Sequence, residues 1–193
     1  MRRIASARWR PHVDSAHADR AMREWLNDRT SLTAKLIDAC LHFRVRRLRQ
    51  GCGMSMADET AAIGLRKRRQ VREREVLLEC DGVPVVYAHT IVPLDATTSD
   101  WPFFGTLGER SLGTTLFGDP KVMRGELRFA RLHASHPLAA RVACAIGVKT
   151  LETPLHARRC LYRRRQGLLL VTEIFLPAIA HIGRNAAKAE RTE

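Results

Sequence analysis

Two charged residues stand in apolar segments that lie far apart in the chain. Glu173 lies in LLLVTEIFLPAI (Leu168–Ile179), where Thr172 is the only other polar side chain, and Arg74 lies in VREREVLLECDG (Val71–Gly82). A guanidinium can grip a carboxylate through two parallel hydrogen bonds. Apolar surroundings raise the pKa of a carboxyl group, so that it can donate a proton near neutrality. The pair predicts a site for a small anion that combines a ring with carboxylates.

The segments also indicate where these charges point, because alternate residues of a strand share one face. The residues on the face of Glu173 are apolar: Leu169, Val171 and Phe175. The residues on the face of Arg74 are apolar too: Val76, Leu78 and Cys80. We expect the acids of the other face to meet solvent: Glu75, Glu79 and Asp81. Two other interpretations stay open, a buried salt bridge without a chemical task and side chains that reach water at the sheet edge.

The elements that must position these residues begin with two helices. They are expected after Ser15 and Ser31, which can cap them, because apolar residues recur there at helical spacing. Residues 41–48 then alternate as in a strand, which a glycine-rich break at Gln50–Gly53 should end. A charged stretch without clear periodicity follows.

Two hairpins dominate the rest of the chain. Asp81-Gly82, a dipeptide suited to a tight turn, separates one pair of strands, and Gln166-Gly167 separates another. Between the hairpins we expect a short helix ending at Gly118, a strand over Glu126–Leu132 and a helix opened by Pro137. This order predicts an α+β fold, with helices packed on a single antiparallel sheet.

Length and composition favour one domain. A chain of 193 residues can bury a sizeable core, and we assign residues 1–183 to the domain and 184–193 to a polar, disordered tail. No apolar run is long enough to span a bilayer. The cysteines are odd in number and form no CxxC pair, which argues against a zinc site or a disulfide framework and favours a reducing cytoplasm.

The net charge of +13 leaves several kinds of partner open. Basic clusters at Arg44–Arg49, Arg66–Arg74 and Arg158–Arg165 could attract nucleic acid, an anionic membrane surface or a small anionic substrate. The clusters lack the interleaved aromatic residues that stack on bases. We therefore expect no nucleic-acid partner, and expect most of these charges to be solvated.

Other common chemistries find no support in the sequence. It contains neither a P-loop nor a GxGxxG motif after a strand, so no nucleotide cofactor is indicated. His133 and His136 could offer two nitrogens to a metal, but no acid-bearing helix completes a ligand set there. His89, in the middle of a hairpin strand, is interpreted as structural or as lining a pocket.

At these residues the sequence resembles the chorismate pyruvate-lyase family of bacterial ubiquinone biosynthesis. Four blocks carry the resemblance, in the same order and at similar spacing: WLNDRTSLTAKL (Trp25–Leu36), REVLLECDGVPVVYAHTIVP (Arg74–Pro93), LGERSLGTTLF (Leu107–Phe117) and RRCLYRRRQGLLLVTEIFLPA (Arg158–Ala178). The similarity extends from about Trp9 to Ala178. Two departures are that Leu32 replaces a methionine and that His89 stands where arginine is common.

The resemblance implies an internal ligand site under helical flaps and a reaction without cofactor or metal, the cleavage of chorismate to 4-hydroxybenzoate and pyruvate. Carried over by position, Arg74 holds the ring carboxylate and Glu173 lies near the oxygen that becomes the phenol. The backbone of Leu112 supplies a hydrogen bond, and Leu32 covers the ligand. A cytoplasmic monomer with no stable membrane insertion and inhibited by its product is expected. The alternative is a non-catalytic, aromatic-acid-sensing module of a transcription regulator, which has a similar fold.

Overall fold

A single antiparallel sheet organises the protein. The computed structural model describes residues 6–149, 151 and 154–182. The six strands are β1 (Phe43–Met54), β2 (Gln70–Cys80), β3 (Val83–Pro93), β4 (Val122–Leu132), β5 (Leu155–Arg164) and β6 (Gly167–Phe175). Their order across the sheet is β1-β2-β3-β6-β5-β4, and every neighbouring pair is antiparallel. The predicted α+β class is confirmed.

Both predicted hairpins form, and local turn chemistry explains them. Asp81 and Gly82 have φ angles of 51° and 79°, the left-handed pair that matches the twist of two antiparallel strands. In the second hairpin Arg165 takes the left-handed conformation, with φ 54°, so the turn lies one residue earlier than expected and Gly167 already belongs to β6.

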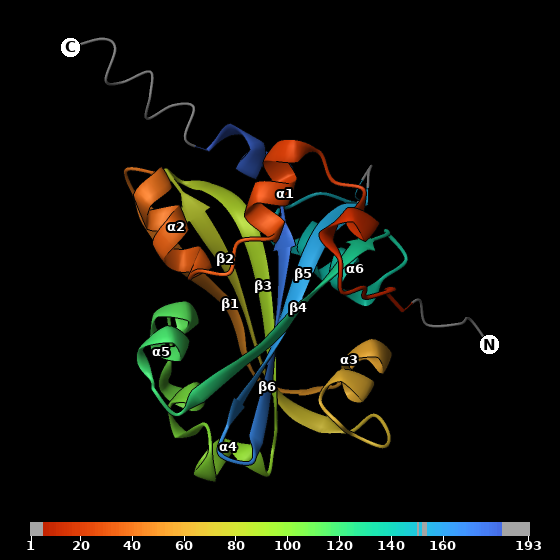
Figure 1. Ribbon diagram of the computed structural model, residues 1–193, viewed down its shortest axis with the longest axis vertical. Helices are drawn as coiled ribbons and strands as arrows, with labels where there is room; N and C mark the ends of the chain where they lie inside the picture. The colour runs from red at the N-terminus through yellow and green to blue at the C-terminus, as the bar shows by residue number, and fades with distance from the viewer. Residues whose placement is uncertain (1–5, 150, 152–153, 183–193) are drawn as a thin grey trace.

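Helices cover both faces of the sheet (Figure 1). On one face lie α2 (Leu32–Ala39) and α5 (Leu112–Gly118), whose buried leucines join a core with the even-numbered residues of β2. On the other face lie α3 (Ala57–Ala62) and α6 (Pro137–Ala145), where Leu138 and Val142 pack with Leu77 of β2. The alternation of β2 thus separates the two halves of the core.

The shorter elements connect these layers. They are α1 (Arg20–Leu26), α4 (Ala96–Ser99) and the 3-10 turns η1 (Val13–Ala16), η2 (Pro102–Thr106) and η3 (Pro177–His181). The predicted helix after Ser15 starts later than expected, because His17 adopts a left-handed φ of 48° and Asp19 provides the cap, accepting from the N–H of Met22 at 2.8 Å. Ser31 caps α2 as predicted.

Strand β1 continues through the expected break at Gln50–Gly53. It pairs with β2 along its whole length, with one register shift between Arg47 and Arg49. A Cβ atom at Gly53 would lie 2.3 Å from the carboxyl carbon of Glu73. The glycine therefore leaves room for a buried carboxylate on the neighbouring strand and does not end the strand.

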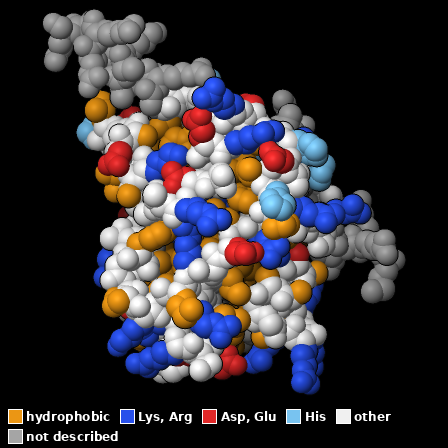
Figure 2. Space-filling model, viewed as in Figure 1, with side chains coloured by type: hydrophobic (Ala, Val, Ile, Leu, Met, Phe, Trp, Pro, Cys, Tyr) orange, Lys and Arg blue, Asp and Glu red, His pale blue; other side chains and the backbone are white. Residues whose placement is uncertain are grey.

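The basic clusters are not uniformly solvated. Figure 2 shows Lys and Arg side chains scattered among acidic and apolar ones over one face. Arg158, from the predicted surface cluster Arg158–Arg165, is instead 1% exposed. The predicted tail, residues 184–193, lies outside the described residues, so the division at residue 183 stays a prediction.

Within the described part of the chain, every helix is too short or too polar to cross a bilayer.

Candidate active site

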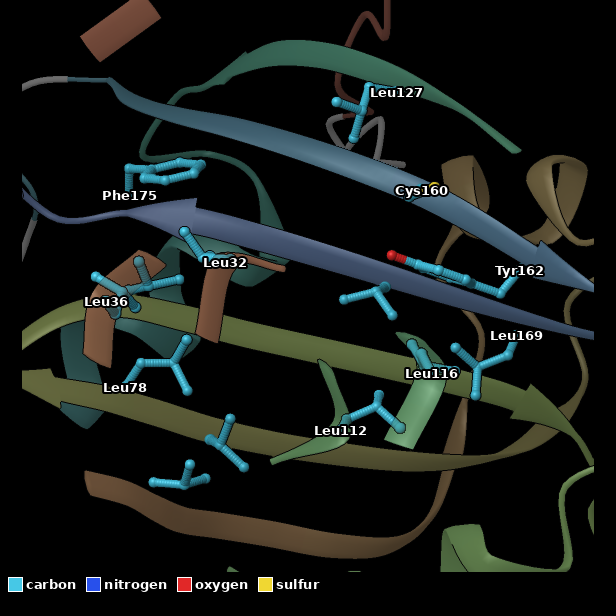
Figure 3. Close-up of a cluster of buried hydrophobic side chains, with 14 of the residues drawn as sticks. Leu32, Leu36, Leu78, Leu112, Leu116, Leu127, Cys160, Tyr162, Leu169 and Phe175 are labelled. Carbon is cyan, nitrogen blue, oxygen red and sulfur yellow. The ribbon is translucent and has the colours of Figure 1, made fainter. Parts of the chain in front are cut away.

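A cavity lies between the sheet and the helices α2 and α5. All six strands contribute side chains to it, and residues 30–33 and 111–117 cover it. The space between these side chains amounts to about 540 Å³, a volume that includes open solvent at the mouth. Figure 3 shows how Leu32 and Leu36 from α2 and Leu112 and Leu116 from α5 approach the face of the sheet that carries Tyr162. Apolar and polar side chains both line the cavity, and converging polar groups give a binding site its specificity.

The structure brings the four predicted residues together around this cavity: Arg74 on β2, Glu173 on β6, Leu32 at the start of α2 and Leu112 at the start of α5. Strand β3 lies between β2 and β6, and pairs Thr90 with Arg74 and Ala88 with Glu173. Arg74 and Glu173 are thus separated by one strand and lie on the same face of the sheet as their partners on β3. Their side chains therefore enter the same chamber.

Arg74 is a buried cation with donors to spare. The residue is 3% exposed. Its Nη2 donates to the carbonyl oxygens of Gly108 at 3.0 Å and Arg110 at 2.8 Å. The Nε atom is buried without a partner among the described residues. Burial and the charge of Arg47 lower the pKa of Arg74 to about 10, so it remains charged at neutral pH. A carboxylate in the cavity would supply the missing acceptor.

Glu173 is not the unpaired carboxyl group that its apolar surroundings led us to expect. Its Oε2 accepts from Nε of Arg158 at 2.5 Å, and the Glu173 side chain is 20% exposed. Arg158 stands directly opposite Glu173 on the neighbouring strand β5. Glu173 therefore does not lie among apolar neighbours alone, because a guanidinium pairs with its carboxyl group.

The sequence contained a signal for Arg158. In Arg158–Tyr162 the alternate residues Arg158, Cys160 and Tyr162 share one face, and all three are buried. This is the pattern that singled out Arg74, but the neighbouring arginines Arg159 and Arg163 make the segment look like a solvated basic cluster. Tyr162, which also lines the cavity, was missed for the same reason. Arg124, another lining residue, was missed because the predicted strand began at Glu126, whereas β4 begins at Val122.

The cavity arginines also hold the loops that precede both covering helices. Arg158 Nη1 donates to the carbonyl oxygen of Asp28 in the loop before α2 at 2.7 Å, and to that of Trp25 at the end of α1 at 3.0 Å. Arg124 Nη1 donates to the carbonyl oxygen of Arg29 in the same loop. Arg74 binds the loop before α5 in the same way. Each covering helix therefore starts from a loop fixed to a guanidinium of the cavity.

The acids of β2 are buried on the opposite face, which corrects the expectation that they meet solvent. Glu73 and Glu75 are 1% and 7% exposed, and Nη1 of Arg141, from α6, contacts both carboxylates. Arg49 Nε lies 3.0 Å from Glu73, and Arg46 Nε lies 2.6 Å from Glu79. Arginines from β1 and α6, which sequence proximity does not reveal, neutralise these acids.

His89 belongs to this second cluster and not to the cavity. It is 0% exposed, with Nε2 3.0 Å from Oε1 of Glu59 and Nδ1 3.4 Å from Oε1 of Glu75. Ligand atoms of Glu73, Glu75 and His89 lie close enough together to hold a metal ion. The guanidinium of Arg141 already occupies the two carboxylates, so the cluster carries its own cations. The structural interpretation of His89 holds.

His89 should make folding stability depend on pH. Burial alone lowers the pKa of His89, but the charges of Glu59 and Glu75 outweigh burial and raise it to about 9. A group with a raised folded-state pKa stabilises the fold fully below its ordinary value of about 6.5, and this contribution is lost as the pH rises to about 9. At ~1.4 kcal/mol per pKa unit, the expected loss is about 3 kcal/mol. Urea unfolding at pH 6 and pH 9.5 measures it.

A matched variant separates this effect from other titrations. His89→Gln should be less stable than the wild type at pH 6 and should lack the extra fall in unfolding free energy between pH 6.5 and 9. The same pH dependence in both proteins would contradict a charged His89.

His136 makes two contacts within the protein. Its Nδ1 accepts from the N–H of Leu138 at 3.2 Å, which caps α6, and its Nε2 lies 3.4 Å from Oδ2 of Asp58. His133 is exposed. The two histidines of the HxxH segment therefore do not converge.

Comparison with known proteins places this chain in a family. Residues 4–183 match the family described as chorismate lyase. The chain is 44% identical over 178 residues to a probable chorismate pyruvate-lyase of Cupriavidus metallidurans, covering 92% of this chain and 83% of the relative. It is 46% identical over 162 residues to a probable chorismate pyruvate-lyase of Ralstonia nicotianae, covering 81% of each protein.

Among solved structures, the C-terminal domain of the histidine utilization repressor from Pseudomonas syringae pv. tomato has a similar fold. The TM-score is 0.54 at 13% sequence identity, over 71% of this chain and 93% of that domain. At this identity the likeness concerns the fold alone.

Proposed function

The chain belongs to the chorismate lyase family, and we propose that it cleaves chorismate to 4-hydroxybenzoate and pyruvate in the cavity under α2 and α5. The observation that carries this proposal is the convergence of Arg74 and the Arg158–Glu173 pair in one chamber, which apolar side chains also line. Such a chamber suits an aromatic acid, because the ring packs against leucines while the charged groups meet the guanidinium and the carboxylate.

In the proposed complex, Arg74 binds the carboxylate on the ring. Its buried and unpartnered Nε and its charge at neutral pH support this role. Leu112 opens α5, and the first N–H groups of a helix have no acceptor within it. The N–H of Leu112 is therefore available to the ligand, and the side chain of Leu32 covers the ring.

Glu173 then acts on ring carbon C4. As a carboxylate held by Arg158, it takes the proton from C4, and the electron pair of that bond completes the aromatic ring. The bond between C3 and the ether oxygen breaks, and its electrons leave on the enolate of pyruvate. The enolate gains a proton at its methylene carbon, so one proton is lost and one is gained. The hydroxyl on C4 becomes the phenol.

The reaction needs no external oxidant or reductant, because aromatisation of the ring supplies the driving force. The protein contributes position and charge: it holds the ether where elimination is favoured and stabilises the negative charge that develops on the leaving group. No cofactor is therefore part of the proposal.

The setting of the enzyme follows from its product. We expect 4-hydroxybenzoate to enter ubiquinone biosynthesis, and we expect a cytoplasmic monomer that needs neither nucleic acid nor insertion in a membrane. The five free cysteines suit a reducing compartment. The product keeps the carboxylate and the hydroxyl that the cavity recognises, so its release should limit turnover and it should inhibit the enzyme.

Gly113→Ala should speed the release of product. A Cβ atom at Gly113 would lie 2.9 Å from Oγ1 of Thr33, and that oxygen already lies 2.7 Å from Oγ of Ser111. Either α5 moves away from α2 or Thr33 gives up this hydrogen bond, and both changes loosen the contact between the two helices. Overpacking of this kind costs ~1–3 kcal/mol, which corresponds to a roughly tenfold faster dissociation of 4-hydroxybenzoate if the cost falls on the closed cover. Stopped-flow displacement measures the rate.

Gly118→Ala is the matched control, because it makes the same change in the same helix where no atom lies within 4 Å of the added Cβ. Equal dissociation rates in the two variants would show that the contact between α2 and α5 does not control release.

The proposed activity has a simple test. Chorismate incubated with the purified chain should give equal amounts of 4-hydroxybenzoate and pyruvate, with no nucleotide or metal added. A chain that binds 4-hydroxybenzoate but leaves chorismate intact would favour the second candidate, a sensor module, which the fold of the repressor domain makes the relevant alternative.

A further inference from the structure

The charges around the cavity do not balance. Four charged side chains line it: Arg74, Arg124, Arg158 and Glu173. Glu173 is paired with Arg158 at 2.5 Å. Neither Arg74 nor Arg124 has a carboxylate partner among the described residues, and the Nε atom of each is buried without a hydrogen bond there. The cavity therefore presents two uncompensated guanidiniums, which suits a ligand with two negative charges.

Arg124 is placed apart from Arg74. It lies on β4, the edge strand at the far end of the sheet from β1, and three strands separate it from β2. Its Nη1 donates to the carbonyl of Arg29 in the loop before α2, and its guanidinium carbon lies 5.2 Å from the ring centroid of Phe117 on α5. Arg124 thus touches both parts of the cover, at a distance from the ring-carboxylate position assigned to Arg74.

Tyr162 provides a second donor beside Arg124. The two residues stand opposite each other on β4 and β5, and both line the cavity. The Tyr162 ring extends over the sheet face that Leu112 and Leu116 approach (Figure 3). Burial raises the pKa of Tyr162, so the phenol keeps its proton and can donate.

Arg158 is already paired within the protein, unlike Arg124. Its Nε donates to Glu173, and its Nη1 donates to the carbonyl oxygens of Trp25, Leu26 and Asp28. Of the cavity cations, Arg124 is the one left with both charge and an unused buried donor once Arg74 holds the ring carboxylate.

We propose that Arg124, assisted by the Tyr162 hydroxyl, binds the second carboxylate of the substrate, the one on the enolpyruvyl ether. This inference rests on the proposed function. It assigns the two guanidiniums different tasks: Arg74 binds a group that substrate and product share, whereas Arg124 binds a group that leaves with pyruvate. The cavity then distinguishes a dianionic substrate from its monoanionic product.

Two stable ligands test this assignment without turnover. The first, 3-(carboxymethoxy)-4-hydroxybenzoate, carries an ether-linked carboxylate beside the ring hydroxyl; the second has an amide in place of that carboxylate. Titration calorimetry should show that the wild type prefers the dianion to the amide. Arg124→Gln should weaken binding of the dianion at least tenfold and leave the affinities for the amide and for 4-hydroxybenzoate within about threefold of wild type.

The control variant is Arg128→Ala, which removes an exposed arginine of the same strand that lies 3.4 Å from Glu126, and it should bind all three ligands as the wild type does. An unchanged preference for the dianion in Arg124→Gln would overturn the proposal. An equal loss for all three ligands would overturn it too, because Arg124 would then act only through the cover.

The outcomes also separate this inference from the proposed function. Arg124-dependent binding of the dianion in a chain that releases no pyruvate from chorismate would leave the carboxylate site standing and remove the lyase activity. If the wild type cleaves chorismate and Arg124→Gln keeps an unchanged preference for the dianion, the lyase activity stands and the carboxylate site at Arg124 is removed.

Discussion

Arg74→Ala should lower kcat/KM for chorismate by about 10²–10³-fold, the largest effect on binding expected of any single change. Truncating one partner of a buried, hydrogen-bonded charge pair costs ~2–5 kcal/mol, and each ~1.4 kcal/mol is a factor of ten. Because Arg74 is expected to bind a carboxylate that the product retains, the dissociation constant of 4-hydroxybenzoate should rise by a similar factor. Steady-state kinetics and calorimetry measure the two effects.

Arg74 also holds the loop before α5 through Gly108 and Arg110, so its loss can disturb the cover as well as the ligand. Arg74→Lys addresses this, since a lysine keeps the charge but cannot make the bidentate contact, and it should recover part of the affinity. Arg72→Ala, an exposed position two residues away on the same strand, should behave as the wild type. Full activity in Arg74→Ala would contradict the proposed site.

Glu173→Gln should lower kcat by roughly 10²–10⁴-fold, the range expected when a general base is removed. The amide keeps the shape of the side chain, and its oxygen can still accept from Nε of Arg158, so the variant should fold. KM for chorismate and the affinity for 4-hydroxybenzoate should change far less than kcat, because the carboxylate acts in the transition state. The kinetics should be measured from about pH 5 to pH 9.

Asp119→Asn is the matched control for Glu173→Gln. Asp119 is also paired with an arginine of β5, Arg164, at 2.7 Å, but it does not line the cavity. The same change from carboxylate to amide should leave kcat unaltered there. A Glu173→Gln enzyme with wild-type kcat and an unchanged pH profile would exclude proton transfer by Glu173 and leave it only an orienting role.

Local sequence signals predicted the two hairpins and the face of its strand on which each of Arg74 and Glu173 lies. A left-handed turn at Asp81-Gly82 depends on those two residues alone, and the period of two in β2 and β6 sends Arg74 and Glu173 to one face of the sheet. The pairing of β3 with β6 joins the two hairpins and places both residues around one cavity, and no local signal predicted that pairing.

The partners of the buried charges could not be predicted in the same way. Arg158 reaches Glu173 across a strand pair, and the alternation that marks it is hidden in a run of arginines. Glu75 was expected in solvent because its cation, Arg141, comes from a helix elsewhere in the sequence. The extension of β1 through Gly53 likewise depends on space needed by Glu73, a tertiary contact that a local pattern does not contain.

The most direct test of the central claim is a crystal structure of the chain with 4-hydroxybenzoate. We expect one ligand in the cavity under α2 and α5, with its carboxylate on the Arg74 guanidinium, its hydroxyl beside Glu173 and Leu32 over the ring. A ligand bound outside this cavity, or one in the cavity that touches neither Arg74 nor Glu173, would contradict the claim.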